Sequence, residues 1–447
     1  MEVIVCLLAL VLSACEAQVF FQPEQVHLAY GAQPSYMVVT WVTLNHTNTP
    51  SYVEYGIDSL SWVVKNSGQK EFVDGGNETR SIFIHSVTMT HLKPGERYMY
   101  HVGGPLGWSD IFYFRTMPTN TDFSARFALY GDMGNENAVA LSSLQELAQS
   151  GSIDAILHVG DFAYDMDTDN ARYGDIFMNQ IQPIAAYVPY MVCPGNHEAA
   201  YNFSNYRNRF TMPGGSGDSL FYSFNIGKAH VISFSTEVYY YYSYSKYGWL
   251  QIINQYKWLE NDLRAANTPE ARAQRPWIIV QGHKPMYCSN NDGPTEQCNN
   301  LKGNLLRYGI PSLHAFSIED LFYKYGVDLQ FYAHEHSYER LWPVYNMTVC
   351  NGTESAYDNP RAPVHVITGS AGNREGQTGF NPEPYPWSAT HSDDYGYTLM
   401  TVVNATLIDL KQISIDKGGK VIDHMMITKE KSNPGFDCHL HHQRALL

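Results

Sequence analysis

The stretch AILHVGDFAYDMD, residues 155–167, indicates the fold and raises the question of function. Its first five residues form an apolar run of the length of a buried strand. Asp161 and Tyr164 follow directly, at the position where α/β proteins bind ligands. A tyrosine in a loop is by itself ordinary packing. The rest of the chain decides whether Tyr164 packs or takes part in chemistry.

Similar apolar runs recur after Pro118. They are residues 127–130, 155–159, 190–193, 230–234, 277–280 and 329–332. They are too uniformly apolar for a sheet with one face in water and suit a sheet covered on both faces. Helical patterns separate them, among them residues 137–149 and 247–266, where apolar residues recur at helical spacing. The chain after Pro118 is therefore predicted to be α/β.

The segment 23–118 follows a different pattern. Short alternating stretches at 37–43, 51–56, 86–92, 97–104 and 111–116 are separated by turn residues, as in a β-sandwich. The sequence LKPGERY, residues 92–98, has the form of the turn before a tyrosine corner, which favours a fibronectin type III-like module. A last β-rich piece, with strands expected in 363–373 and 397–416, would complete the sheets of the second domain.

The N-terminus and the charge bear on location and partners. Residues 1–17 contain an apolar run from Val3 to Leu12 followed by small residues, as in a secretory signal peptide, although Leu12-Ser-Ala-Cys15 also fits a bacterial lipoprotein signal. Six N-x-[ST] sequons favour a secreted, extracellular glycoprotein. They lie at Asn45, Asn77, Asn202, Asn346, Asn351 and Asn404. No later segment has the ~20 apolar residues of a membrane span, and a net charge of −15 argues against nucleic acid.

The seven cysteines become five if Cys6 and Cys15 leave with the signal. Cys288 and Cys298 bracket a polar loop, so we expect a disulfide between them in an oxidising compartment. Cys193 lies in an apolar run and is expected to be a buried free thiol. The pairing of Cys350 and Cys438 does not follow from the sequence.

Five of the predicted strands end in residues that bind metals. The turns are GDMG (131–134), GDFAY (160–164), GNHE (195–198), GH (282–283) and AHEH (333–336). A single such turn is an ordinary loop or helix cap. Because ligands bind at the carboxyl ends of strands in α/β sheets, five of them predict one shared crevice.

The donors are two aspartates, one asparagine, three histidines and one tyrosine. Hard oxygen and imidazole nitrogen suit iron, zinc or manganese rather than copper(I) or an iron–sulfur cluster. Seven side chains exceed the needs of one tetrahedral ion, and a carboxylate can bridge two. The set predicts a two-metal site, with ions about 3.5–4 Å apart, of the type that hydrolyses phosphoesters.

These five blocks, in this order and spacing, resemble the signature of the purple acid phosphatases, specifically the long, plant-like branch found in animals, within the calcineurin-like metallophosphoesterases. The resemblance extends to the N-terminal β module, the FRTMP linker and VITGSAGN (366–373). It implies an N-terminal fibronectin III-like β-sandwich (23–118), a layered α/β/β/α metallophosphoesterase domain (124–343) and a C-terminal segment (362–430) that completes it.

The resemblance also implies a ligand for each metal. An iron(III) would take Asp132, Asp161, Tyr164 and His336, and a divalent iron, zinc or manganese would take Asp161, Asn196, His283 and His334. Most relatives in the wider superfamily have Asp-x-His in the first block, whereas this chain has Gly134 in place of that histidine. Tyr164 can substitute for it, and because a phenol has a pKa of ~10, ionising it requires a strongly acidic cation.

The expected activity is hydrolysis of small phosphate monoesters by attack of metal-bound hydroxide, with an acidic optimum. The alternatives are a phosphodiesterase or pyrophosphatase with the same centre, and an iron-binding surface glycoprotein. The oligomeric state does not follow from the sequence.

Three further residues bear on the chemistry and its limits. His197 matches the family histidine that contacts phosphate or assists the leaving group, or else it orients Asn196. The histidine pair that plant relatives carry about ten residues after His283 is absent here, which leaves Asp292 as a candidate general acid. Ala333 stands where the family usually has glycine.

Other residues receive no catalytic role. Asp165 and Asp167 are expected in a turn or cap, and the tyrosines 239–242 are expected to pack near a domain contact or the pocket wall. Glu198 and Tyr338 are expected to support the site. A solvated tail is expected at His439, His441 and His442.

Overall fold

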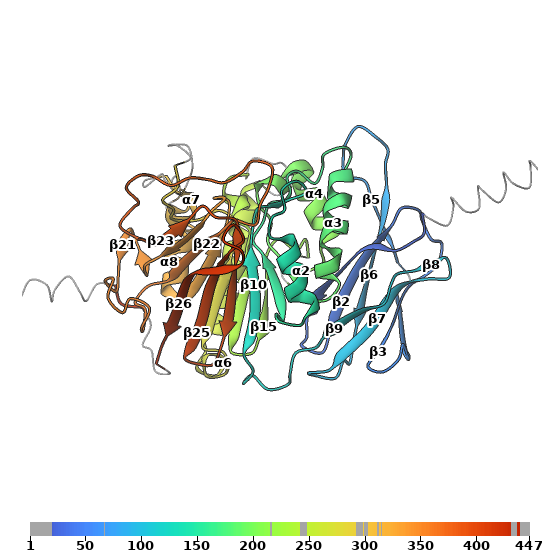
Figure 1. Ribbon diagram of the computed structural model, residues 1–447, viewed down its shortest axis with the longest axis horizontal. Coiled ribbons are helices and arrows are strands. Elements are labelled where there is room, and N and C mark those ends of the chain that lie inside the picture. Colours follow the sequence, from blue (N-terminus) through green and yellow to red (C-terminus); the bar gives the residue numbers. More distant parts are fainter. Residues whose placement is uncertain are drawn as a thin grey trace, which may run out of the picture.

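The computed structural model describes residues 20–66, 68–214, 217–241, 248–291, 298, 303–310, 313, 315–430 and 436–438. The expected signal peptide, Asp292, Tyr242 and the histidines of the tail lie outside these ranges. The N-terminal module lies at one end of the molecule, and the sheets and helices of the second domain make up the rest (Figure 1). Among the described residues, no helix has the length and apolar character to cross a membrane.

The N-terminal module consists of two antiparallel sheets packed into a sandwich. One has the order β1-β2-β6-β5, and the other has the order β4-β3-β7-β8 with β9 also paired to β7. The strands are β1 (Glu24–Tyr30), β2 (Met37–Thr43), β3 (Ser51–Gly56), β4 (Trp62–Asn66), β5 (Lys70–Phe72), β6 (Ile82–Met89), β7 (Arg97–Gly104), β8 (Gly107–Trp108) and β9 (Phe112–Arg115). The expected tyrosine corner is present, because the hydroxyl of Tyr98 accepts the N–H of Lys93 at 2.9 Å.

Two mixed sheets form the second domain. The first has the order β14-β12-β10-β24-β25-β26, and the second has the order β15-β16-β17-β18-β22-β19-β23. Their strands are β10 (Ala125–Tyr130), β12 (Ala155–His158), β14 (Tyr190–Val192), β15 (Tyr222–Ile226), β16 (Ala229–Ser233), β17 (Trp277–Gln281), β18 (Leu329–Tyr332), β19 (Tyr338–Leu341), β22 (Val364–Thr368), β23 (Ser388–Ser392), β24 (Gly396–Val402), β25 (Leu407–Ser414) and β26 (Lys420–Thr428). The C-terminal strands extend both sheets, as the sequence predicts.

Helices and short ladders complete the domain. In Figure 1, α2 and α3 lie between the first sheet and the N-terminal module, and α8 lies beside the second sheet. The helices are α2 (Leu141–Gln149), α3 (Arg172–Ala185), α4 (Ala200–Arg209), α5 (Gly248–Ala266), α6 (Pro269–Gln274), α7 (Leu305–Tyr308) and α8 (Ile318–Lys324), with 3₁₀ turns η1 (Asn196–Glu198) and η2 (Glu237–Tyr239). Two-residue strands pair as β11 (Met133–Gly134) with β13 (Phe162–Ala163) and β20 (Val344–Tyr345) with β21 (Thr348–Val349).

The expected order of helices and strands is confirmed, with shifts at some ends. The helix expected from residue 137 begins at Leu141 instead, because Asn137 has a φ of 59°, outside the helical region. The strand expected at 86–92 begins earlier, at Ile82, and ends at Met89.

Buried polar contacts join the N-terminal module to the second domain. The guanidinium of Arg209 is 1% exposed and donates to Gln25 Oε1 at 3.0 Å and to Asp175 Oδ1 at 2.8 Å. Arg80 of the module also pairs with Asp175, and Tyr100 donates to the carbonyl of Ala186 at 2.8 Å. Because a buried charge is costly unless it is paired, this network holds the two parts in one fixed arrangement.

Candidate metal centre

The candidate ligands follow the carboxyl ends of strands in both sheets. Asp132, Asp161 and Asn196 come after β10, β12 and β14 of the first sheet, and His283 and His334 come after β17 and β18 of the second. The paired strands within each group are parallel, so their ends meet at the same edge. The sequence predicts that these turns converge, and the structure brings donors from both sheets together at one place.

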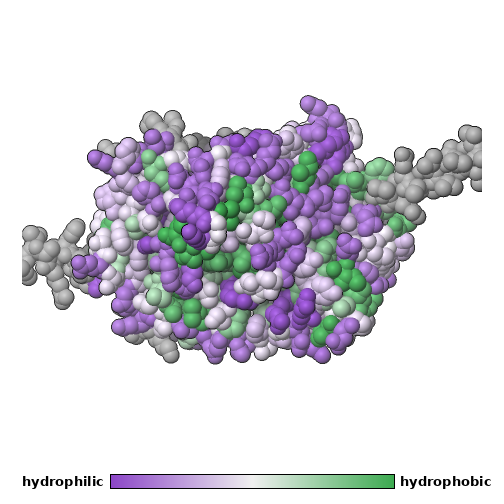
Figure 2. Space-filling view, viewed as in Figure 1, coloured by the Kyte–Doolittle hydropathy of each residue, from purple (hydrophilic) through white to green (hydrophobic). Residues whose placement is uncertain are grey.

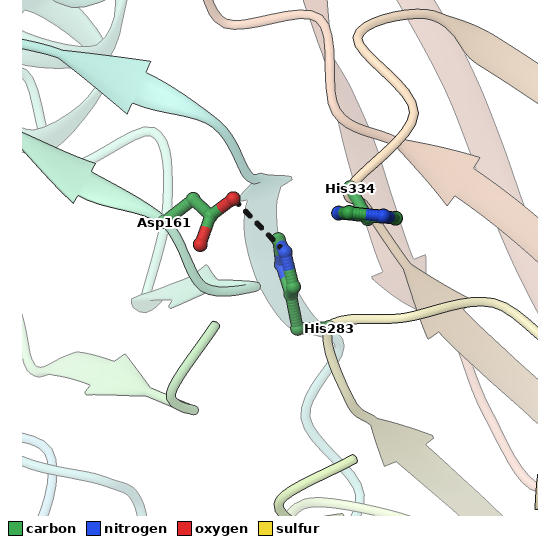
Figure 3. A group of neighbouring side chains, drawn as sticks. All are labelled: Asp161, His283 and His334. Atoms are coloured by element: carbon green, nitrogen blue, oxygen red, sulfur yellow. Dashed lines mark ion pairs between the residues drawn. The ribbon is translucent and has the colours of Figure 1, made fainter. Parts of the chain in front are cut away.

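Asp161, His283 and His334 form the first group of donors (Figure 3). One ligand atom from each lies within 4.8 Å of the others. His283 Nε2 is 3.0 Å from Asp161 Oδ2 and 3.1 Å from Asn196 Oδ1, while its Nδ1 donates to the carbonyl of Val159 at 2.9 Å. This bond leaves Nε2 with its lone pair toward the site, which is the arrangement of metal-binding histidines.

Asp132, Tyr164 and His336 form the second group. The hydroxyl of Tyr164 is 2.7 Å from His336 Nε2 and 3.3 Å from Asp132 Oδ1. His336 Nδ1 donates to the carbonyl of Gly376 at 2.8 Å, so its Nε2 is likewise left for the site. The backbone N–H of His334 donates to Asp132 Oδ2 at 3.0 Å and joins the two groups. All seven candidate ligands therefore lie in one connected cluster, and the chemistry of its donors fits two cations.

The backbone of the site is strained. Asp132, Asp161, Tyr164 and His334 have φ of 58°, 56°, 55° and 70°, in the left-handed region that residues with side chains rarely adopt. Such conformations cost about 1–3 kcal/mol each and persist where the surrounding structure enforces them, typically at functional sites.

Glycines leave room for the ligands. A Cβ at Gly160 would lie 2.6 Å from His283 Nδ1, and one at Gly195 would lie 2.2 Å from Asp161 Oδ1. A Cβ at Gly131 would lie 2.4 Å from the methyl of Ala333, so the glycine at residue 131 accommodates the alanine that departs from the family pattern.

Burial and crowding shape the electrostatics. Burial, together with the nearby charge of Asp161, raises the pKa of Asp132 well above its ordinary value. Burial opposes ionisation of Asp161 as well, but His283 and His197 hold its pKa well below the ordinary value. Burial and the charge of Asp132 raise the pKa of Tyr164. Asp132, Asp161 and Tyr164 would repel one another if all three were ionised, and cations bound between them would offset that repulsion.

His197 lies beside the cluster, and its partner Asp165 has a role that was not expected. Its Nδ1 is 2.6 Å from Asp165 Oδ1, and its ring lies 4.4 Å from the ring of Tyr164. Asp165 lies in a turn, as expected, because its carbonyl accepts the N–H of Thr168 at 3.1 Å. Its carboxylate has the further role, since one oxygen fixes the imidazole and the other pairs with Arg374 at 3.0 Å. Burial lowers the pKa of His197, but Asp161 and Asp165 raise it to about 9.

Two more residues shape the site without having been expected there. The amide of Asn373 donates to the hydroxyl of Tyr164 at 2.7 Å and to the carbonyl of Asp132 at 3.1 Å. Lys284 Nζ lies 2.8 Å from His334 Nε2 and 5.6 Å from the centre of the Tyr240 ring. Lys284 directly follows the candidate ligand His283 in the sequence, so its place near the site could have been expected.

Glu198 supports the site, as expected, whereas the supporting role expected of Tyr338 stays a prediction. The carboxylate of Glu198 accepts the N–H groups of Asp161 and Phe162, at 3.0 and 2.8 Å, and that of Gly195, at 2.7 Å, so it ties two ligand turns together. The hydroxyl of Tyr338 donates to Asp423 at 2.7 Å.

The cysteines and sequons have the following places. Disulfides join Cys288 to Cys298 and Cys350 to Cys438, and Cys193 is a buried free thiol. The Cys288–Cys298 disulfide lies against Glu335, which stands between His334 and His336 in the sequence.

Four of the sequon asparagines are exposed, namely Asn45, Asn77, Asn346 and Asn404. The other two, Asn202 and Asn351, are half-buried. Tyr239 is buried and donates to the carbonyl of Phe316 at 2.8 Å, in keeping with a packing role.

Comparison with known proteins gives the class and then the family. Residues 125–338 match the model of the calcineurin-like phosphoesterases, and the fold and site define a metallophosphoesterase of that class. Residues 23–116 match the purple acid phosphatase N-terminal domain, and residues 362–424 match the iron/zinc purple acid phosphatase-like protein C model.

Known relatives are similar in sequence to this chain over nearly its whole length. Acid phosphatase type 7 of Danio rerio is 52% identical over 418 residues, covering 92% of this chain and 93% of that protein. The protein of the same name from Homo sapiens is 49% identical, covering 91% of each chain. The chain belongs to the purple acid phosphatase family and is accordingly a phosphatase, with the binuclear metal centre that the family implies.

A solved structure agrees in fold. A purple acid phosphatase isolated from seeds of yellow lupin, Lupinus luteus, superposes with a TM-score of 0.76 at 24% identity, covering 92% of this chain and 75% of that one.

Proposed function

We propose that the chain is a secreted acid phosphatase that hydrolyses small phosphate monoesters at a centre of iron(III) and a divalent iron, zinc or manganese. Asp132, Tyr164 and His336 would hold the iron(III), and Asn196, His283 and His334 would hold the divalent ion. Asp161 would bridge them. The proposal includes the division expected from the sequence, with a signal peptide at 1–17 and units at 23–118, 124–343 and 362–430.

The position of Tyr164 is the observation that carries this proposal. Its hydroxyl lies within hydrogen-bond distance of His336 and Asn373, at 2.7 Å from each, and 3.3 Å from Asp132. Gly134 supplies no side chain there. Burial disfavours the phenolate, and iron(III) is acidic enough to overcome that cost, which favours it over a second divalent ion on this side.

The chain's own residues would bind and orient the phosphoryl group and would move a proton. When bound, the two ions supply an activated water and the positive charge that phosphoryl oxygens need. His197 Nε2 faces the cluster, 4.0 Å from Asp161 Oδ2 and 3.8 Å from Glu375 Oε1, while Asp165 fixes the ring through Nδ1. The carboxylates of Asp161 and Asp165 raise the pKa of the imidazole and so favour its protonated form at acidic pH, in which it can bind a phosphoryl oxygen or give a proton to the leaving group.

Metal analysis with a visible spectrum tests the proposed centre. Metal-replete, oxidised wild type should contain two metal ions per chain, at least one of them iron, and show a visible absorption band. Tyr164→Phe should keep the fold and lose the band. A colourless, iron-containing wild type would overturn the tyrosinate assignment.

Paired assays test the substrate class. We expect turnover of aryl monoesters to exceed that of the matching diesters and of pyrophosphate, with an acidic optimum. The reverse order would favour the phosphodiesterase or pyrophosphatase alternative, and two bound metals without turnover of any phosphoester would favour the iron-binding glycoprotein. Secretion is tested by expression in a eukaryotic cell, where glycosylated protein should appear in the medium.

A further inference from the structure

A cavity of about 700 Å³ lies between the N-terminal module and the second domain, away from the metal centre. It is bordered by β9 and the linker after it, by the start of β10, by the end of α2 and by the segment 187–189. Arg126 and Asp154 lie at or just before the starts of β10 and β12, whereas the candidate ligands follow the other ends of these strands. At ~3.3 Å per residue, the six-residue strand β10 separates the two places by roughly 20 Å.

The cavity has the size and lining of a small-molecule site. Pockets of ~300–1,000 Å³ hold typical small ligands. Aromatic rings contribute much of the wall, namely Tyr30, Tyr113, Phe114, Phe123 and Tyr187.

The charges in the cavity are unusual for this acidic chain. Among the described residues that line it, three are arginines, at positions 97, 115 and 126, and one is an acid, Asp154. The guanidinium of Arg126 already donates two hydrogen bonds to Asp154, at 2.8 and 3.2 Å. Arg97 and Arg115 are exposed, and no carboxylate pairs with either of them among the ion pairs of the described residues.

The register of the sheet places these two arginines directly opposite each other. In the antiparallel pair of β7 and β9, Arg97 faces Arg115. Opposite residues of such a pair project on the same side with Cβ atoms about 4.5–5.5 Å apart, and like charges there are destabilising. The guanidinium of Arg97 lies 4.4 Å from the centre of the Tyr113 ring, and Arg115 donates to the carbonyl of Gly95 at 2.9 Å. Both contacts leave further N–H groups for an anion.

We propose that this cavity binds a small anion that carries a phosphate group, with Arg97 and Arg115 as its clamp. A doubly charged oxyanion between them converts their repulsion into two charge-assisted contacts, for which the planar guanidinium is well suited. The aromatic walls can hold an apolar or aromatic body attached to the phosphate.

Equilibrium dialysis of the holoenzyme against radiolabelled inorganic phosphate tests the proposal. Wild type should bind two phosphates per chain, one at the metal centre and one in the cavity. The double variant Arg97→Gln/Arg115→Gln should lose one of them, or bind it at least about tenfold more weakly, and keep its turnover at saturating monoester. Arg264→Gln, which changes an exposed arginine on α5, is the matched control and should keep both. A single phosphate on wild type, or two equally bound on the double variant, would overturn the proposal.

Thermal melting of a single variant provides a second test, which does not depend on the double variant's folding. In phosphate-free buffer Arg97→Gln should melt no lower than wild type, because the repulsion is relieved, and it should gain less from added phosphate. Melting below wild type in that buffer would show that the pair is structural and contradict the clamp.

A third measurement distinguishes the sources of the phosphate. Phenylphosphonate cannot be hydrolysed at its carbon–phosphorus bond. If it occupies the second site about tenfold more tightly than inorganic phosphate, the ligand is a phosphate ester with an aromatic body. Equal affinity identifies free phosphate, and failure of both probes to bind there overturns the proposal.

Discussion

At the scale of single residues, the partners of the candidate ligands matter as much as the ligands. The candidate ligands follow strands, so the sequence alone could point to them. Their partners could not be predicted in this way, because they come from distant segments. Asn373 contacts Tyr164, and Arg374 contacts Asp165, each pair being 209 residues apart in the sequence. Only a folded structure shows which polar side chain arrives at which ligand.

Asn373 should tune the colour of the proposed iron centre. Asn373→Ala removes the amide that donates to the oxygen of Tyr164, so the phenolate should become more electron-rich and its absorption band should move to longer wavelength. The visible spectrum of oxidised protein measures this. Asn137→Ala, which removes a bond to the carbonyl of Asn373 without touching Tyr164, is the control and should keep the band in place. An unmoved band in Asn373→Ala would count against the tyrosinate.

Asp165 should act through His197. Asp165→Asn should lower kcat about 10–100-fold, the usual effect of losing a carboxylate that orients an active-site imidazole, while the metal content stays at two per chain. Steady-state assays together with metal analysis measure both quantities. Asp167→Asn, in the same loop, should change kcat far less, and equal losses in the two variants would contradict the role given to Asp165.

At the scale of elements, strand interiors and strand ends differ in how well the sequence predicts them. The uniformly apolar β12, β17 and β18 were expected nearly as they occur. In contrast, β1 was not predicted, since Gln25 and His27 break its apolar pattern. Both are buried against the second domain. Gln25 accepts a hydrogen bond from the guanidinium of Arg209, and His27 contacts the backbone carbonyl of the same residue. A polar residue whose partner lies in another domain looks like a loop residue in the sequence.

The turn after β12 should depend on the absence of a side chain at residue 160. Gly160→Ala places a methyl against the ring of His283 and also strains a φ of 85°. We expect metal binding to weaken at least about tenfold, measured by competition with a chelator. Gly151→Ala has a comparable φ of 71° with nothing within 4 Å of the added methyl, so it isolates the backbone strain. If both variants lost metal equally, strain rather than contact would be the cause.

At the scale of the whole molecule, the docking of the N-terminal module should make the protein sensitive to acid. His27 lies within this interface, with its ring nitrogens 2.7 Å from the carbonyl of Gln25 and 2.9 Å from that of Arg209. Burial lowers the pKa of His27 from 6.5 to about 4. The unfolded chain therefore takes up this proton first, and native stability falls as the pH drops from 6.5 to 4.

The variant His27→Gln should weaken this dependence. The loss attributable to His27 is about 3 kcal/mol at most, so the urea midpoint of wild type should fall more between pH 7 and pH 4.5 than that of the variant. The exposed His424→Gln is the control and should follow wild type. Parallel midpoints for wild type and His27→Gln would show that His27 does not contribute.

Hydrophilic residues cover most of the face shown in Figure 2, and apolar residues gather on it only in separate groups. On this face, therefore, no single broad apolar surface points to a permanent partner.

The placement of the candidate ligands on two different sheets has a thermodynamic consequence. Ions held by Asp161 from one sheet and by His283 and His334 from the other would bind only when the sheets are correctly seated against each other. Linkage makes the effect reciprocal, so affinity for the ions and cohesion of the two sheets share one coupling free energy. A substitution deep between the sheets, far from any donor, should therefore loosen the ions, and chelation should speed amide exchange in both sheets at once.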